Sequence, residues 1–142
     1  MRTYKLKLDI KYLDDVKSGK KNFEIRKNDR EFKVGDILEL KAYVKGLKAF
    51  AKWGEIIDPF NNFRMSHNYM TCAEEDADTI KVKILRVIYP KQINYDLTHW
   101  VSLSSSFGKI NLDDVRKVLK EYFNRKTLPK DYVLLEIEVI KK

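Results

Sequence analysis

The chain has 142 residues and one cysteine, Cys72. This length is typical of a single domain, residues 1–142, that buries about two thirds of its unfolded surface and needs no metal or disulfide for stability. A lone cysteine excludes an intramolecular disulfide and favours a reducing compartment. The 29 lysines and arginines against 21 aspartates and glutamates give a net charge of +8. This excess favours an anionic partner, and a lysine-rich solvated surface explains it equally well.

Several classes of protein are excluded by what the sequence lacks. No apolar run approaches the roughly 20 residues of a membrane helix, and the first residues contain no signal-peptide core, so we expect a cytoplasmic protein without membrane contact. There is no glycine-rich phosphate loop. His67, Cys72 and His99 do not have a zinc spacing, so we expect no metal and no cofactor.

The first third of the chain predicts three strands and one short helix. Residues 4–8 and 37–43 alternate between apolar and polar side chains, as half-buried strands do. Residues 12–18 have helical spacing, and Gly19 ends that helix. In the strand 23–26, Phe23 and Ile25 face one side while Glu24 and Arg26 face the other.

The rest of the chain begins with a segment, 44–78, that we interpret as an insertion of unassigned structure. Residues 79–89 alternate, with Ile80, Val82, Ile84 and Val87 on the buried face, and Pro90 ends this strand. Asn111 is the expected N-cap of a helix that runs to residue 123, and residues 131–140 form the last strand. Because the strands are closely spaced and the helices few, we predict an α+β fold with a mostly antiparallel β-barrel and flanking short helices.

The densest polar stretch surrounds the strand 23–26. A period of two places Asn22, Glu24 and Arg26 on one face, with Lys21 at the entrance of the strand. Polar side chains on one face of a strand line either the solvent side of the sheet or a polar pocket. The pattern alone favours solvated charges.

The segment Ser18 to Arg30 carries the pattern G-x-K-x-x-E-x-R-x-N-D-R, and Val34 to Leu38 carries V-G-D-x-L. These motifs resemble the ASCH branch of the PUA-like superfamily, and in particular an uncharacterised phage-associated ASCH-like family. The strand at residues 128–134 also resembles that family. The resemblance implies a small β-barrel whose cleft holds RNA, nucleotides or modified bases.

Transferred position by position, the resemblance implies that Lys21, Glu24 and Arg26 line the ligand cleft and that Asn28, Asp29 and Arg30 border it. Lysine and arginine match phosphate or a base edge, and a glutamate accepts from an exocyclic amine. For the corner 28–30 we favour a structural alternative. There, asparagine and aspartate cap backbone amides and the arginine pairs with a carboxylate.

Two other functions remain open. A related ASCH protein is an amidohydrolase that acts on acetylcytidine and carries G-x-K-x-x-T-x-R, so Lys21 and Glu24 are the catalytic candidates if this chain hydrolyses an acylated cytidine-type nucleoside. The threonine of that motif is Glu24 here, and no acidic residue lies near Gly108. The third possibility is a protein-interaction module of phage or host.

The insertion raises one further hypothesis. Aromatic residues interleaved with basic ones are typical of surfaces that stack single-stranded nucleic acid. A subsidiary core under the insertion is the alternative that we favour. The residues concerned are the aromatic Phe50, Trp53 and Phe60 and the basic Lys45, Lys48, Lys52 and Arg64.

Overall fold

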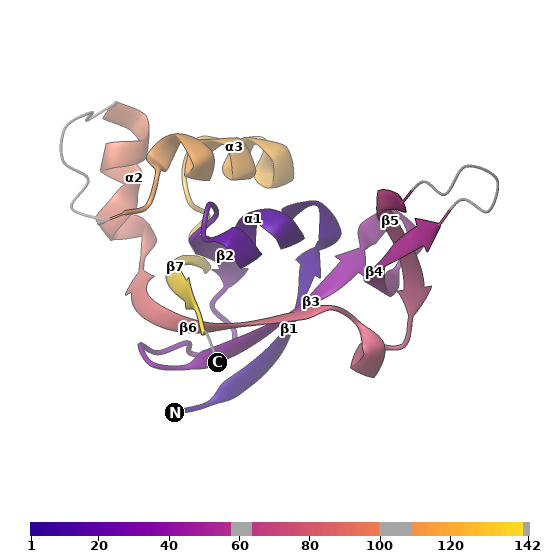
Figure 1. The fold of residues 1–142 in the computed structure, drawn as a ribbon. Helices are drawn as coiled ribbons and strands as arrows, with labels where there is room; N and C mark the ends of the chain where they lie inside the picture. Colours follow the sequence, from indigo (N-terminus) through magenta and orange to yellow (C-terminus); the bar gives the residue numbers. More distant parts are fainter. Residues whose placement is uncertain (58–63, 100–108, 141–142) are drawn as a thin grey trace.

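The computed structural model describes residues 1–57, 64–99 and 109–140, with the backbone alone for 53–57 and 64–68. Figure 1 shows the helices on one side of a sheet and a hairpin that projects beyond its end. The strands are β1 (Thr3–Asp9), β2 (Phe23–Lys27), β3 (Ile37–Val44), β4 (Ala49–Ile57), β5 (Arg64–Cys72), β6 (Thr79–Ile88) and β7 (Tyr132–Val139). The helices are α1 (Leu13–Ser18), α2 (Pro90–His99) and α3 (Leu112–Phe123), with 3-10 turns η1 (Ile10–Tyr12), η2 (Lys45–Leu47) and η3 (Glu74–Asp76).

All the described strands belong to one curled, seven-stranded sheet. The strand order is β2-β7-β6-β3-β4-β5, and β1 pairs with β3 outside this path. The β1–β3 pair is parallel, whereas the other described pairs are antiparallel. The predicted α+β class with a mostly antiparallel sheet is therefore confirmed.

The sheet is a half-barrel that is open between β1 and β2, since no strand pairing joins these two edges within the described residues. Side chains bridge the gap instead. Arg26 Nη2 donates to the Lys7 carbonyl oxygen at 2.6 Å, and the Tyr4 hydroxyl donates to the Arg30 carbonyl oxygen at 3.1 Å. This gap positions the candidate site.

Two apolar clusters flank the sheet. The first fills the concave face under α1, and the second lies between the sheet and helices α2 and α3. Strand β7 contributes to both, because Val133 and Leu135 face the first cluster while Leu134 faces the second. Burial on both faces explains the apolar run at the start of this strand, whereas Glu136 and Glu138 alternate with apolar residues towards its end.

Strand β6 also contributes side chains to both clusters, because its pairing with β7 contains a bulge. The pairing of β6 with β7 shifts register between Ile84 and Arg86. Ile84 lies in the first cluster with Val87 packed against it, whereas Ile88 lies in the second. The extra residue of a bulge changes which face later side chains occupy, so the predicted inward position of Val87 is confirmed.

Helix α2 was not predicted from the sequence. Pro90 was expected to end a strand, whereas in the structure it is also the first residue of a helix. Proline is favoured at the first helical position because its missing N–H has no partner there in any case. The Gln92 side chain accepts from the Tyr89 backbone N–H at 2.8 Å, which caps the helix start. Ile93 and Leu97, four residues apart, bury one face.

The segment 44–78 contains a hairpin, β4–β5, whose pairing shifts register between Gly54 and Ile56. Of the aromatic residues in the stacking hypothesis, Phe50 packs edge-on against Tyr43 with ring centroids 5.2 Å apart. Trp53 lies in β4 but its side chain is outside the described part, and Phe60 and Arg64 are likewise outside the described residues or side chains. Within the described ranges, no helix is long and apolar enough to cross a membrane.

Gly19 is predicted to be essential for the end of α1. Its φ of 84° lies in the left-handed region, and its N–H donates to the Val16 carbonyl oxygen at 3.1 Å. We expect Gly19→Ala to lower the free energy of unfolding by about 1 kcal/mol, because a Cβ strains this backbone conformation. Urea denaturation measures the change. Gly46→Ala is the control, since Gly46 has no positive φ and an added Cβ meets nothing within 4 Å. Equal losses in both variants would contradict the conformational explanation.

Candidate functional site

A cavity of about 310 Å³ opens between the edges of β1 and β2, with α3 along one wall. Its size lies at the lower end of the range for small-molecule sites. Strands β1, β2 and β7, the turns η1 and η2, and helix α3 all contribute side chains. Residues from distant parts of the sequence therefore meet at the gap between β1 and β2.

Three charged side chains from the G-x-K-x-x-E-x-R motif form one ion cluster in this cavity. Lys21 Nζ donates to Glu24 Oε1 at 2.8 Å, and Arg26 Nε donates to Glu24 Oε2 at 3.0 Å. Lys21 Nζ also donates to the Phe23 carbonyl oxygen at 2.8 Å. Glu24 and Lys21 are buried, at 4% and 9% exposure, and Arg26 is half-buried, so these charges are paired within the fold, whereas the pattern alone favoured solvated ones.

The electrostatics of Glu24 are a balance of two effects. Burial by itself would raise the pKa of the Glu24 carboxyl, but the positive charges and hydrogen bonds of Lys21 and Arg26 outweigh it and lower the pKa. The carboxylate is thus ionised at neutral pH, with a cation on each oxygen. In this arrangement both oxygens of Glu24 accept from cations, and the carboxylate positions Lys21 and Arg26.

Local structure explains why the three side chains meet. The turn at Gly19 leads the chain back so that the Lys21 N–H donates to the Asp15 carbonyl oxygen at 2.9 Å. The alternation of β2 then places Glu24 and Arg26 on one face, as predicted. Lys21 Nζ also lies 5.0 Å from the centre of the Tyr12 ring and 4.7 Å from that of Phe23.

Tyrosine and phenylalanine rings form the walls of the cavity. Tyr12 and Tyr122 lie side by side with centroids 6.4 Å apart, and Phe123 packs edge-on against Tyr132 at 4.9 Å. The Tyr122 hydroxyl donates to Asp9 Oδ2 at 2.8 Å. Burial, reinforced by the Asp9 carboxylate, raises the pKa of the Tyr122 phenol far above its usual value, so this hydroxyl is a neutral donor.

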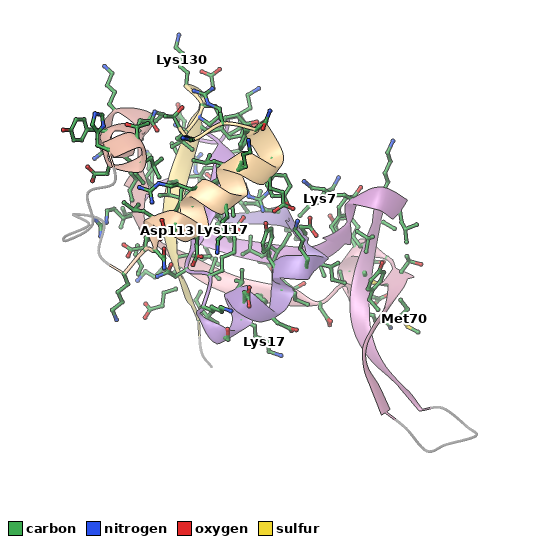
Figure 2. The ribbon with its side chains drawn as sticks, turned by 90° about the horizontal axis from the view of Figure 1, so that it is seen from above. Lys7, Lys17, Met70, Asp113, Lys117 and Lys130 are labelled. Atoms are coloured by element: carbon green, nitrogen blue, oxygen red, sulfur yellow. The ribbon has the colours of Figure 1, made fainter. Side chains whose placement is uncertain are left out.

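Two exposed lysines, Lys7 and Lys45, lie at the rim. Lys45 Nζ is 3.7 Å above the Tyr122 ring, and Lys7 Nζ is 4.5 Å above the Tyr43 ring. Neither has a carboxylate within ion-pair distance in the described part of the chain. Figure 2 shows Lys7 where the hairpin joins the rest of the sheet. The rim therefore carries positive charge that an anionic ligand can neutralise.

The other predicted site residues lie elsewhere. Asn28, Asp29 and Arg30 do not line this cavity, and Asn22 is directed to the Lys109 carbonyl oxygen at 3.2 Å. The structural interpretation of the corner is wrong, because the side chains of Asn28 and Asp29 cap no backbone amide in the described residues. Arg30 lies over the Tyr4 ring, 5.9 Å from its centre, instead of pairing with a carboxylate.

Sequence reasoning missed several residues of the cavity. Tyr122 has the helical spacing of a core residue, and its neighbours in the sequence do not indicate that its hydroxyl faces a cavity. Lys7, Asp9 and Tyr12 lie outside the motif and join it only because the sheet curls. Across the described residues, no three metal-ligating side chains come together.

Sequence comparisons with known proteins match only part of the chain, and the family match contains the whole G-x-K-x-x-E-x-R motif. Residues 3–57 match the family described as "Domain of unknown function (DUF3850)". The "Uncharacterized 12.9 kDa protein in GpA 3'region" of Escherichia phage P2 is 44% identical over 46 residues, which is 32% of this chain and 42% of the phage protein. The match thus spans less than half of that relative, and it agrees with the phage-linked part of the resemblance.

A solved structure covers more of the chain at lower similarity. The structure of hypothetical protein PH0355 is 20% identical with a TM-score of 0.45, over 99% of this chain and 100% of the other. The names of these proteins state no ligand or activity.

Proposed function

We propose that this chain binds one nucleotide unit, either free or within RNA, in the cavity between β1 and β2. The observation that carries the proposal is the combination of tyrosine walls, a buried ion cluster and two rim lysines without carboxylate partners around one cavity. In this arrangement the ring faces hold a base and the rim cations hold its phosphate. The resemblance of the Lys21, Glu24 and Arg26 motif to ASCH domains supports the same ligand class.

The size and chemistry of the cavity support a single nucleotide over a duplex. A volume of about 310 Å³ suits one small ligand. Stacking of a base on an aromatic side chain contributes about 1–3 kcal/mol and tolerates any base. Specificity then depends on Arg26, because its Nη1 has no partner among the described residues and the guanidinium matches base-edge acceptors.

The proposal predicts that affinity depends on the rim lysines only when the ligand carries a phosphate. We expect Lys45→Ala to weaken binding of adenosine monophosphate about tenfold, because it removes one charge-assisted contact. Binding of adenosine should change little. Isothermal titration of the four mononucleotides and their nucleosides, at low and moderate salt, measures both effects. Wild-type affinity for the nucleotides should fall with added salt.

Lys17→Ala is the matched control, because it removes the same charge from a residue that does not line the cavity. Figure 2 shows Lys17 well apart from Lys7. Equal affinity for nucleotide and nucleoside, or equal losses in the Lys45 and Lys17 variants, would contradict a phosphate at the rim. Absence of binding by every nucleotide and nucleoside would overturn the proposal.

The same samples test the alternative of amide hydrolysis. No serine or threonine lines the cavity among the described residues, and Lys21 and Glu24 hold each other in an ion pair. A nucleophilic lysine needs the neutral amine, whereas this pair needs the ammonium form. Mass spectrometry of acetylcytidine incubated with the protein should therefore show no loss of the acetyl group. Loss that depends on Lys21 would establish the hydrolase instead.

A further inference from the structure

Hydrogen bonds join the walls of the cavity between β1 and β2 to one another. Arg26 Nη2 donates to the Lys7 carbonyl oxygen and links β2 to β1. The Tyr122 hydroxyl donates to Asp9 Oδ2 and links α3 to β1. The Tyr12 hydroxyl donates to a glutamate of α3 at 2.7 Å and links η1 to that helix. A polynucleotide that passed through this wall would break one of these links, so the cavity favours a free nucleotide or the end of a chain.

The ionised side chains that line the cavity have a positive excess. Among the lining residues that the structure describes, four are cations and two are carboxylates, so two positive charges remain uncompensated. The cations are Lys7, Lys21, Arg26 and Lys45, and the carboxylates are Asp9 and Glu24.

Both carboxylates are held by groups of the protein. Glu24 accepts from a cation on each of its oxygens. Asp9 Oδ1 accepts from the Lys11 N–H at 3.2 Å, and its Oδ2 accepts from the Tyr122 hydroxyl. A ligand anion therefore meets the two rim lysines, which have no carboxylate partner within the described ranges.

The charge of a phosphate depends on how it is esterified. A phosphodiester within a chain carries one negative charge. A terminal phosphomonoester carries about 1.5 to 2 negative charges at neutral pH, because its second pKa is about 6. The monoester thus matches the excess of two positive charges, and each rim lysine gains a charge-assisted hydrogen bond. A phosphodiester leaves one of these charges uncompensated.

We propose that this cavity recognises a terminal phosphomonoester, so that its ligand is a free mononucleotide or the phosphorylated end of an RNA. This inference rests on the proposed function of the same cavity. It narrows the ligand class, because it excludes a nucleotide within a chain. The 5′ and 3′ ends of an RNA present the same phosphate chemistry, and the experiment separates them.

The test uses isothermal titration at neutral pH and one salt concentration. Its probes are 5′-adenosine monophosphate, the methyl ester of its phosphate, adenosine and ribose 5-phosphate. The methyl ester keeps the base and the sugar but carries a single charge. We expect adenosine monophosphate to bind at least tenfold more tightly than the methyl ester, because the ester leaves one lysine without a counter-charge. Ribose 5-phosphate should bind more weakly than adenosine monophosphate, since it has no base to stack.

Lys7→Ala tests the contribution of one rim lysine. We expect this variant to weaken adenosine monophosphate about tenfold, the methyl ester less, and adenosine little. The Lys7 carbonyl oxygen that accepts from Arg26 is retained, so the bridge between β1 and β2 should persist. Lys5→Ala is the matched control, because Lys5 is exposed, lies on the same face of β1 and does not line the cavity. Equal losses in both variants would overturn the proposal.

A comparison of RNAs identifies the end that binds. Octa-uridylate is titrated with a 5′-phosphate, with a 3′-phosphate and without a terminal phosphate. We expect a phosphorylated RNA to bind at least tenfold more tightly than the unphosphorylated one, and the tighter of the two phosphorylated RNAs identifies the end.

The outcomes separate this inference from the proposed function. Equal affinity for adenosine monophosphate and its methyl ester, or for all three RNAs, would overturn the terminal phosphate while nucleotide binding stands. Ribose 5-phosphate that binds as tightly as adenosine monophosphate would overturn the nucleotide proposal and support a phosphomonoester site. Absence of binding by every probe would overturn both.

Discussion

Replacing Glu24 with alanine is expected to lower the free energy of unfolding by about 3–5 kcal/mol. The variant leaves Lys21, which is 9% exposed, as a buried cation without its carboxylate partner. Arg26 loses the same partner, and with it the group that orients its bridge to the β1 edge. Urea denaturation followed by circular dichroism measures the loss.

Glu121→Ala is the control for this prediction. Glu121 accepts from the Tyr12 hydroxyl at 2.7 Å and pairs with Lys11, but both groups of that ion pair are well exposed. A surface pair of this kind contributes at most about 1 kcal/mol, so the control should be mild. A loss in Glu24→Ala no greater than in Glu121→Ala would show that the buried cluster contributes no stability.

The pH dependence of the same comparison gives a second readout. The folded protein lowers the pKa of Glu24 below its usual 4.5, so the unfolded chain binds the proton more readily. The stabilisation is therefore fully present above pH 4.5 and is lost as the pH falls through the lowered value. We expect the difference between wild type and Glu24→Ala to shrink on acidification below that pH. A difference that grows there would contradict the direction of the shift.

Leu119→Ala is expected to lower the free energy of unfolding by about 2–5 kcal/mol, since it leaves a hole in the second cluster. Leu119 is fully buried at 0% exposure and anchors α3 to the sheet. The same helix presents Val118, Tyr122 and Phe123 to the cavity between β1 and β2. A loosened α3 should therefore also weaken nucleotide binding, although Leu119 does not line that cavity.

Lys120→Ala, at the next position on the same helix, is the matched control. Lys120 is exposed, and its side chain makes no hydrogen bond or ion pair within the described residues. Both the stability and the nucleotide affinity of Lys120→Ala should therefore stay near wild type. Chemical denaturation and isothermal titration on the same samples separate the two effects. If Leu119→Ala leaves nucleotide affinity unchanged, ligand binding in the cavity does not depend on how α3 packs against the sheet.

The sequence by itself determined the features that depend on near neighbours in the chain. The N-cap at Asn111 is confirmed, because its Oδ1 accepts from the Asp113 and Asp114 N–H groups at 2.9 and 3.3 Å. Gly35 of the V-G-D-x-L motif has a φ of 92°, which is the left-handed conformation that glycine supplies in a tight turn. The common face of Glu24 and Arg26 follows from the two-residue period of a strand. Capping and alternation are local, so they can be read from spacing alone.

Only the tertiary structure decided which of these features form a site. Helix α2 was missed because a proline that ends a strand can equally begin a helix, and the burial of Ile93 and Leu97 against the sheet selects the helix. The hairpin β4–β5 has no clear alternation, so its pairing depends on the partner strand.

The cavity itself is the clearest case. Glu24 reads as a solvated charge until the curl of the sheet brings β1 beside β2 and buries it between two cations. Lys45 and Tyr122 reach the same cavity from distant segments, and their sequence neighbourhoods do not indicate it. Burial and charge pairing across a fold depend on long-range contacts, which a local pattern cannot encode.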